Sequence, residues 1–148
     1  MSATVRAARA QDAAALVPLF AQWEHAQPEP VVAERIAAWA AAPDSELLVA
    51  EVAPGDGALA GLVAVAAQLH LARPGRSARI IGLVVDERAR RRGVGAALLA
   101  AAEELARGWG CDRLELTSSR RRDAAMAFYA ALGFEDWCPV SARLVREL

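Results

Sequence analysis

The sequence contains no lysine and no asparagine, one tyrosine and two cysteines. Without lysine, the Walker A phosphate loop, which needs Gly-Lys-Ser or Gly-Lys-Thr, is excluded. Cys111 and Cys138 lie far apart and show neither CxxC spacing nor clustered histidine. We therefore expect free thiols rather than a disulfide framework, and no metal site. Because every basic residue is arginine and alanine is abundant, codon bias explains part of the composition, and single arginines carry less information than usual.

The chain also lacks a surplus of positive charge and a long apolar run. Its 17 basic and 18 acidic residues give a formal net charge of −1. A dedicated nucleic-acid binder usually has a basic excess, so we expect no nucleic-acid partner. The longest apolar stretch, ALAGLVAVAAQLHL, is too short and interrupted to cross a bilayer, and MSATVRAARA lacks the apolar core of a signal peptide. We expect a cytoplasmic protein with no membrane partner.

The length and composition fit one globular domain. The chain has 148 residues, of which 55% are hydrophobic and 24% charged, enough to bury a core. No linker, repeat or low-complexity tract divides it, so we expect a single domain over residues 1–148.

The hydrophobic pattern predicts strand, helix, helix, three strands, helix, strand, helix and strand, a mixed α/β sheet. Strands are expected at 5–8, 46–52, 58–69, 78–85, 113–119 and 142–148, and helices at 9–25, from about 30, from 94 and at 123–132. Asp12 and Asp123 are expected as helix caps, with Gly133 as the stop of the last helix. Residues 54–57 supply turn chemistry, and the apolar strand 78–85 is expected to be central and covered on both faces.

Between the strand 78–85 and the next helix lies RARRRGVG, residues 88–95. A buried strand, a glycine-containing loop and a helix N-terminus together present unpaired backbone N–H groups and a partial positive charge to an anion. A tight strand-to-helix turn is the alternative for a lone G-x-G. The Rossmann pattern is rejected because its third glycine position is Leu98.

The arrangement Arg90-x-x-Gly93-x-Gly95 resembles the acetyl-CoA signature of the GNAT family of N-acetyltransferases, Q/R-x-x-G-x-G/A at the start of the helix after the central strand. The similarity continues through GCDRLELTSS and AMAFYAALGFED to the family's helix with F-Y-x-x-L-G-F, and it includes the opening VRAARAQDAAAL. This resemblance spans essentially the whole chain. It implies a mixed, mostly antiparallel central sheet with flanking helices.

The resemblance also implies acetyl-CoA as co-substrate, with no metal. Backbone N–H groups of the signature would hold the pyrophosphate, and a strand edge would meet the pantetheine arm and the thioester carbonyl. The implied cofactor-binding residues are Leu83, Val84, Val85, Arg90, Arg91, Arg92, Gly93, Val94, Gly95 and Ala96. Arg88, Arg91 and Arg92 are equally compatible with simple solvation. Arg120 and Arg121 either lie in a solvent-facing loop or contact the adenosine 3'-phosphate of the cofactor. Arg122 stands where many relatives carry asparagine.

Tyr129 falls on the family's general-acid position, where a phenol that is protonated at neutral pH can donate to a departing thiolate. An aromatic residue packed on a helix is the alternative role. The base is missing, because the acidic pair that many relatives place before L-V-V is Ile81 and Gly82 here. Glu24, His25, Glu115 and a water relay remain open as proton acceptors. Trp23, Trp39 and Trp137 are open as walls of the acceptor site or as packing residues.

The sequence thus predicts an acyltransferase that moves the acetyl group of acetyl-CoA to an amine of a small molecule or peptide. The alternative is an acyl-CoA-binding sensor or regulatory domain that retains the cofactor cradle with little or no turnover. A homodimer is left open.

Overall fold

The computed structural model describes residues 3–53, 57–138 and 141–148. Its contacts divide the chain into two compact units, Met1–Leu116 and Thr117–Leu148, and each is described by itself. The expected turn at residues 54–56 lies outside the described residues.

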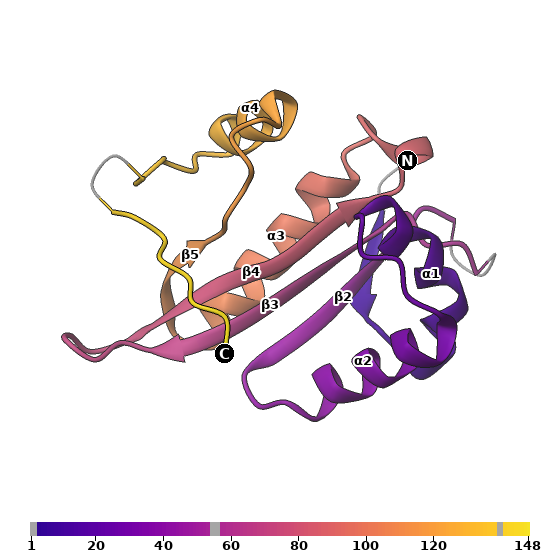
Figure 1. Ribbon diagram of the computed structural model, residues 1–148, viewed down its shortest axis with the longest axis horizontal. Coiled ribbons are helices and arrows are strands. Elements are labelled where there is room, and N and C mark those ends of the chain that lie inside the picture. Colours follow the sequence, from indigo (N-terminus) through magenta and orange to yellow (C-terminus); the bar gives the residue numbers. More distant parts are fainter. Residues whose placement is uncertain (1–2, 54–56, 139–140) are drawn as a thin grey trace. The chain divides into compact units, whose positions relative to one another are not determined.

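The first unit contains a five-stranded sheet in the order β1-β2-β3-β4-β5 (Figure 1). The strands are β1 Thr4–Ala7, β2 Ser45–Glu51, β3 Gly61–Leu69, β4 Arg76–Val85 and β5 Cys111–Glu115. The pairs from β1 to β4 are antiparallel, and β4 pairs with β5 in parallel. The predicted mixed, mostly antiparallel sheet is therefore confirmed.

Helices cover both faces of this sheet. Figure 1 shows α1 and α2 on one face and α3 on the other. The helices are α1 Ala13–Gln22, α2 Glu29–Ala41 and α3 Val94–Gly108, with short 3₁₀ turns η1 Ala10–Asp12 and η2 Glu87–Ala89. In the described residues, no helix combines the length and the apolar character needed to span a membrane.

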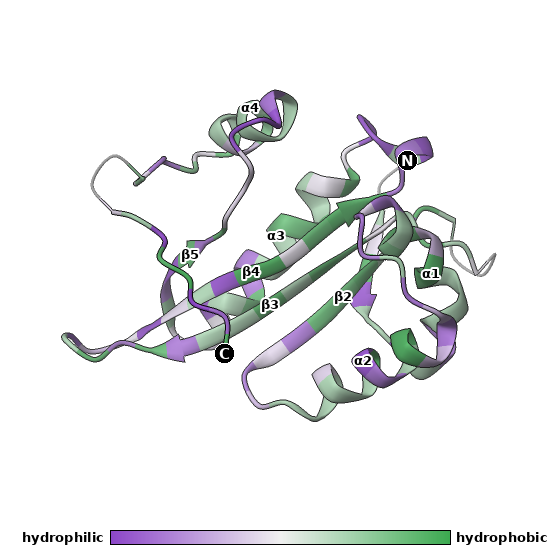
Figure 2. Ribbon diagram, viewed as in Figure 1, coloured by the Kyte–Doolittle hydropathy of each residue, from purple (hydrophilic) through white to green (hydrophobic). Residues whose placement is uncertain are grey.

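Each helix buries the stripe that its sequence predicts. On α1 and α2 the buried residues lie three or four positions apart and pack on β2, β3 and β4, forming one core cluster that includes Leu16, Leu19, Val32, Ile36, Val49, Leu62 and Val84. On α3, Val94, Leu98 and Ala102 are buried, while Glu103 and Glu104 are exposed. Along β4, Figure 2 shows hydrophilic residues near its start and hydrophobic ones toward its end.

The second unit contains α4, Asp123–Ala131, and no strand among its described residues. The predicted strand 142–148 is wrong, because residues 141–148 have no regular secondary structure. Leu144, Val145 and Leu148 are 91%, 71% and 117% exposed, and an apolar alternation forms a strand only where a neighbouring strand pairs with it.

Three smaller expectations also change. Asp12 stands at the N-cap of α1 as expected, but its carboxylate forms no capping hydrogen bond to α1 and instead accepts from the N–H of Arg9, the N-cap of η1, at 2.7 Å. Asp123 is the first residue inside α4, and the N-cap is Arg122. β4 contacts both α1 and α3, but its cover is incomplete at Ile81, which is 50% exposed.

One ion-pair cluster fastens the first strand to its neighbours. Arg6 of β1 donates to Asp12 from Nη1 and Nη2 at 2.8 and 2.9 Å. It also donates to Glu51 of β2 from Nε and Nη2 at 2.8 and 2.6 Å. Asp12 is buried, and its hydrogen bonds from Arg6 hold the pKa of this carboxyl below its usual range. The cluster therefore joins β1, η1 and β2.

Asp12→Asn is expected to lower the free energy of unfolding at neutral pH by about 2 kcal/mol, because it removes a buried charge that accepts hydrogen bonds from Arg6. The pKa of Asp12 is lower in the folded chain, so its stabilisation is complete above the unfolded value of about 3.9. That stabilisation is lost as the pH falls through the folded value. Urea unfolding measured at a series of decreasing pH values should show that the free energy of unfolding falls more steeply for the wild type than for Asp12→Asn.

Glu103→Gln is the matched control, because it breaks the exposed pair that Glu103 forms with Arg107 at 2.6 Å on α3. Such a pair contributes little, so its stability and pH dependence should follow the wild type. Equal losses in the two variants would contradict the structural role of Asp12.

Candidate functional site

The site begins where β4 and β5 separate. Their parallel pairing runs from Arg76 opposite Cys111 to Arg79 opposite Glu115, where β5 ends. β4 continues to Val85. In the part of the chain that the structure describes, the edge of β4 that faces β5 therefore has no strand beside it after Arg79, while β3 pairs with the opposite edge.

A β-bulge marks the same place. On β3, Val65 lies opposite Ile80 and Ala64 opposite Gly82, so Ile81 is an extra residue in β4. A bulge bends and twists its strand, and bulges are frequent beside functional sites. The bulge therefore directs β4 away from its parallel neighbour at the residue after Ile80.

The alternating hydrogen bonds of an antiparallel ladder show which groups of β4 face the open edge. The Asp86 N–H donates to the Ala60 carbonyl at 2.8 Å, so Val84, two residues earlier, also faces β3. Leu83 and Val85 therefore direct their N–H and C=O groups to the open edge. The Val85 carbonyl accepts a hydrogen bond from Arg90 Nε at 3.4 Å. Of the three predicted strand residues, two thus present backbone groups and Val84 contributes a buried side chain.

The turn after β4 is held by a buried carboxylate. Asp86 accepts hydrogen bonds from the Arg88 N–H at 2.9 Å and from Arg88 Nη2 at 2.9 Å. The Arg88 guanidinium lowers the pKa of Asp86. The Glu87 N–H donates to Gln22 Oε1 at 2.9 Å, which connects the turn to α1. Arg88, one of the suspected phosphate ligands, is thus engaged in holding the turn.

The loop then contains two left-handed residues. Arg91 and Gly93 both have left-handed conformations, with φ of 64° and 80°. Alternation between left-handed and right-handed residues gathers successive N–H groups into a concavity that suits an anion. The first bond to an α3 amide joins the Ala97 N–H to the Gly93 carbonyl at 3.0 Å, so the amides of the first turn have no partner within the helix.

The space in front of this loop is open. A Cβ added to Gly93 would meet no atom within 4 Å, so packing in the chain does not require glycine there. Arg91 and Arg92 are exposed, and neither forms an ion pair within the described ranges. The geometry fits a phosphate group bound by main-chain amides with cations beside it. No group of three or more His, Cys, Asp or Glu residues suited to a metal ion occurs among the residues described.

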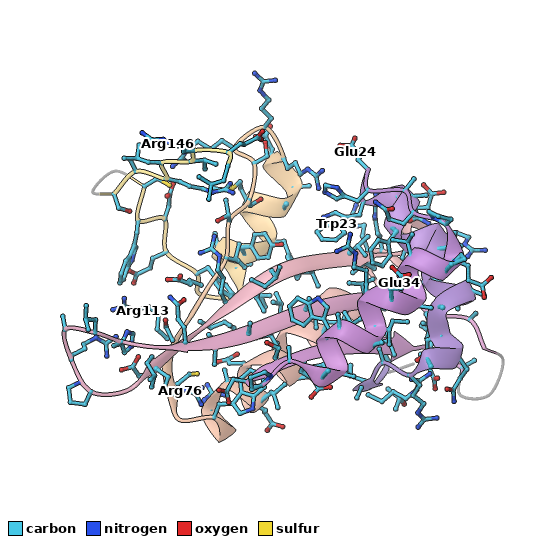
Figure 3. All side chains as sticks on the ribbon, turned by 60° about the horizontal axis from the view of Figure 1, so that its bottom comes forward. Trp23, Glu24, Glu34, Arg76, Arg113 and Arg146 are labelled. Atoms are coloured by element: carbon cyan, nitrogen blue, oxygen red, sulfur yellow. The ribbon has the colours of Figure 1, made fainter. Side chains whose placement is uncertain are left out.

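The place of the missing acidic pair is filled by an aromatic ring. A Cβ on Gly82 would lie 2.4 Å from Cη2 and 2.7 Å from Cζ2 of Trp23. Trp23 follows α1 as its C-cap and reaches toward β4 (Figure 3). A side chain at position 82 would therefore require the ring to shift. Trp23 and Trp39 both pack against the core cluster, Trp39 from α2.

The other candidate proton acceptors, Glu115, Glu24 and His25, lie in different surroundings. Glu115 pairs with Arg79 at 3.2 Å. Glu24 has a left-handed φ of 63° and extends away from β4 in Figure 3. Its backbone ends α1 in a Schellman motif, in which the His25 N–H donates to the Phe20 carbonyl at 3.0 Å. The exposed His25 ring lies edge-on to Trp23, with centroids 4.7 Å apart.

Tyr129 belongs to the second unit. Its ring is half-buried on α4 and contacts Phe128 and Phe134 at centroid distances of 5.3 and 5.8 Å. Burial raises the pKa of the phenol, which keeps it protonated. Arg120 forms an ion pair with Asp136 at 2.7 Å. Trp137 is 53% exposed.

The structure thus brings the predicted residues of β4 and the Arg-Gly loop together within the first unit and places the predicted acid in the second. Three features were missed by sequence reasoning: the bulge at Ile81, the Asp86–Arg88 pair and the Trp23–Gly82 contact. A glycine inside an otherwise apolar strand indicates a bulge or a close approach, so Gly82 carried a usable signal for two of them.

Comparison with known proteins identifies the family and the fold of the chain. The family model described as Acetyltransferase (GNAT) family matches residues 13–134. A putative acetyltransferase from Agrobacterium tumefaciens str. C58 is 26% identical, with a TM-score of 0.82 over 97% of this chain and 99% of that one. An acetyltransferase from Trypanosoma brucei is 24% identical, with a TM-score of 0.81 over 99% and 100%.

A third similar structure contains a coenzyme A derivative. AAC(6')-Iy in complex with the bisubstrate analogue CoA-S-monomethyl-acetylneamine is 18% identical, with a TM-score of 0.82 over 100% of this chain and 99% of that one. Among curated protein sequences no significant match was found.

Gly82→Ala is expected to destabilise the protein by about 1–3 kcal/mol, because the new methyl group overlaps the Trp23 ring. In a Trp23→Ala background the same change should cost much less. Urea unfolding of the two single variants and the double variant gives the coupling free energy directly. Gly108→Ala is the control, since a Cβ there meets nothing within 4 Å. A cost of Gly82→Ala that is the same in both backgrounds would refute the contact.

Proposed function

Because the chain belongs to the GNAT family of acetyltransferases, we propose that it transfers the acetyl group of acetyl-CoA to an amine of a small molecule or peptide. The observation that carries this proposal is the continuity of the open β4 edge with the loop and first turn of α3, all within one unit. The structure of a similar fold with a CoA-containing bisubstrate analogue supports the choice of co-substrate. Acetyl-CoA supplies an acetyl group activated as a thioester.

The main chain does most of the binding in this proposal. The amides from Arg91 to Ala96 hold the pyrophosphate, and Arg91 and Arg92 add positive charge beside it. Leu83 and Val85 offer backbone N–H and C=O groups to the pantetheine arm and to the thioester carbonyl. Arg90 fixes the path of the loop through its bond to Val85. Backbone recognition of this kind tolerates a side-chain composition rich in alanine and arginine.

The transfer itself forms one bond and breaks another. The neutral amine nitrogen bonds to the carbonyl carbon as the carbon–sulfur bond breaks, and Tyr129 donates its proton to the departing thiolate. The amine loses its proton to water, His25 or Glu24, because Trp23 occupies the place of a side chain at Gly82 and Glu115 is paired with Arg79. The cytoplasmic location and the single-domain organisation stay predictions, and the oligomeric state stays open.

Gly95→Val is expected to weaken acetyl-CoA binding at least about 10-fold, a loss of about 1.4 kcal/mol, because a branched side chain in the first turn of α3 obstructs the pyrophosphate. Isothermal calorimetry measures this loss. Gly95 is a cleaner site than Gly93, whose φ of 80° strains any replacement.

Gly108→Val, at the other end of the same helix and facing open space, is the matched control and should bind acetyl-CoA like the wild type. Unchanged affinity for acetyl-CoA in a folded Gly95→Val variant would contradict the proposal that the amides from Arg91 to Ala96 hold the pyrophosphate.

Tyr129→Phe is expected to lower kcat by about 10²-fold or more, the usual contribution of a positioned acid, while acetyl-CoA affinity stays unchanged. The raised pKa of Tyr129 keeps the phenol protonated through neutral pH, so kcat of the wild type should fall only above pH about 10. This alkaline limb should disappear in the variant. Phe128→Leu, which alters the neighbouring ring, is the control. An unchanged kcat in Tyr129→Phe would exclude the acid role.

Tight acetyl-CoA binding without turnover of any amine would instead favour the acyl-CoA sensor. The absence of a side chain at position 82 is the observation that favours this second function.

A further inference from the structure

Trp23 holds an unusual position beside the open edge of β4. Its ring lies against the main chain at Gly82, next to the bulge residue and just beyond the last β4–β5 pair. Trp23 packs against the same core cluster as Trp39 of α2, and in addition its ring lies where a Cβ of Gly82 would stand. The sequence of β4 thus accommodates this ring at the cost of a side chain at the edge where the thioester is proposed to lie.

The surroundings of the ring are apolar and aromatic. From Ile80 to Val85 the strand carries no polar side chain, and Ile81 is 50% exposed. His25 lies edge-on to Trp23 at 4.7 Å, and Phe20 lies edge-on at 6.1 Å on the other side. The left-handed Glu24 turns the chain so that His25 returns beside the ring. This surface offers apolar and aromatic side chains, with the half-buried Trp23 ring among them, and no polar side chain of β4 from Ile80 to Val85.

We propose that Trp23, with Ile81 and His25, is the specificity-determining surface for the acceptor, and that it selects a primary amine carried on an apolar or aromatic body. The proposal rests on the acetyl transfer proposed above. An aryl or alkyl group gains contact with the ring and with Ile81, and an ammonium group is attracted to an indole face. The hydroxyl groups of an amino sugar would lose their water without finding partners on β4.

Binding is measured first, apart from turnover. Calorimetry of the CoA-loaded protein with phenethylamine and with glucosamine should show tighter binding of phenethylamine by about 10-fold or more. Trp23→Leu, which retains apolar bulk, and Trp23→Ala should each weaken phenethylamine binding about 10-fold. Affinity for CoA should stay unchanged, and this affinity also reports that each variant is folded. Trp39→Leu is the matched control and should retain the preference of the wild type.

The proposal is overturned if glucosamine binds as tightly as phenethylamine, if the wild type binds neither amine, or if the Trp23 and Trp39 variants behave alike. Acetylation of the same amines, followed by thiol release, separates this proposal from the proposed function. Binding of phenethylamine that depends on Trp23 but leads to no acetylation contradicts the acetyltransferase and leaves the recognition surface standing. Acetylation with the same preference in Trp23→Leu contradicts the surface and leaves the acetyltransferase standing.

Discussion

The end of the pairing between β4 and β5 is the constraint on which the rest of the site depends. A parallel neighbour would satisfy the backbone groups of β4 along its whole length, and no ligand could then use them. Here the pairing stops at Arg79 and Glu115. The extra residue of the bulge, Ile81, follows shortly after in β4. The exposed edge leads directly into the loop before α3, so one continuous line of main-chain groups is available to a long, flexible co-substrate.

The arginines of the loop before α3 have two different structural roles. Arg88 is bound to the buried Asp86, and Arg90 to the Val85 carbonyl, so both shape the turn. Arg91 contributes through its left-handed backbone. The proposed anion site therefore depends chiefly on backbone amides and on the open space at Gly93, which makes it compatible with a chain of balanced charge.

Much of the fold followed from pattern. The apolar spacing of α1, α2 and α3 and the β2 to β4 runs predicted elements that the structure has within a few residues. The strand at 142–148 failed because alternation shows which face a strand would bury and does not show whether a neighbour pairs with it. Gly82 was a signal for the bulge, but the position of the extra residue at Ile81 depends on the register with β3, which the local sequence does not show.

The sequence predicted those parts of the candidate site that neighbouring residues form. It did not predict the parts that depend on contacts between distant residues. The Gly93 and Gly95 loop joins a strand to a helix within a few residues, so its geometry follows from the sequence. The loss of the acidic pair was visible at Ile81 and Gly82, but its physical reason, a ring from the end of α1, lies nearly sixty residues away in the chain. The contact between Trp23 and Gly82 is therefore a tertiary feature that the sequence alone does not show.

The most direct test of the central claim is a titration of the isotopically labelled protein with coenzyme A, followed by the backbone amide signals in two-dimensional NMR. The account predicts that the largest shifts fall on the amides from Arg91 to Ala96 and on Leu83 and Val85. Saturation without shifts in those amides, or with shifts confined to Arg120 to Arg122, would contradict it.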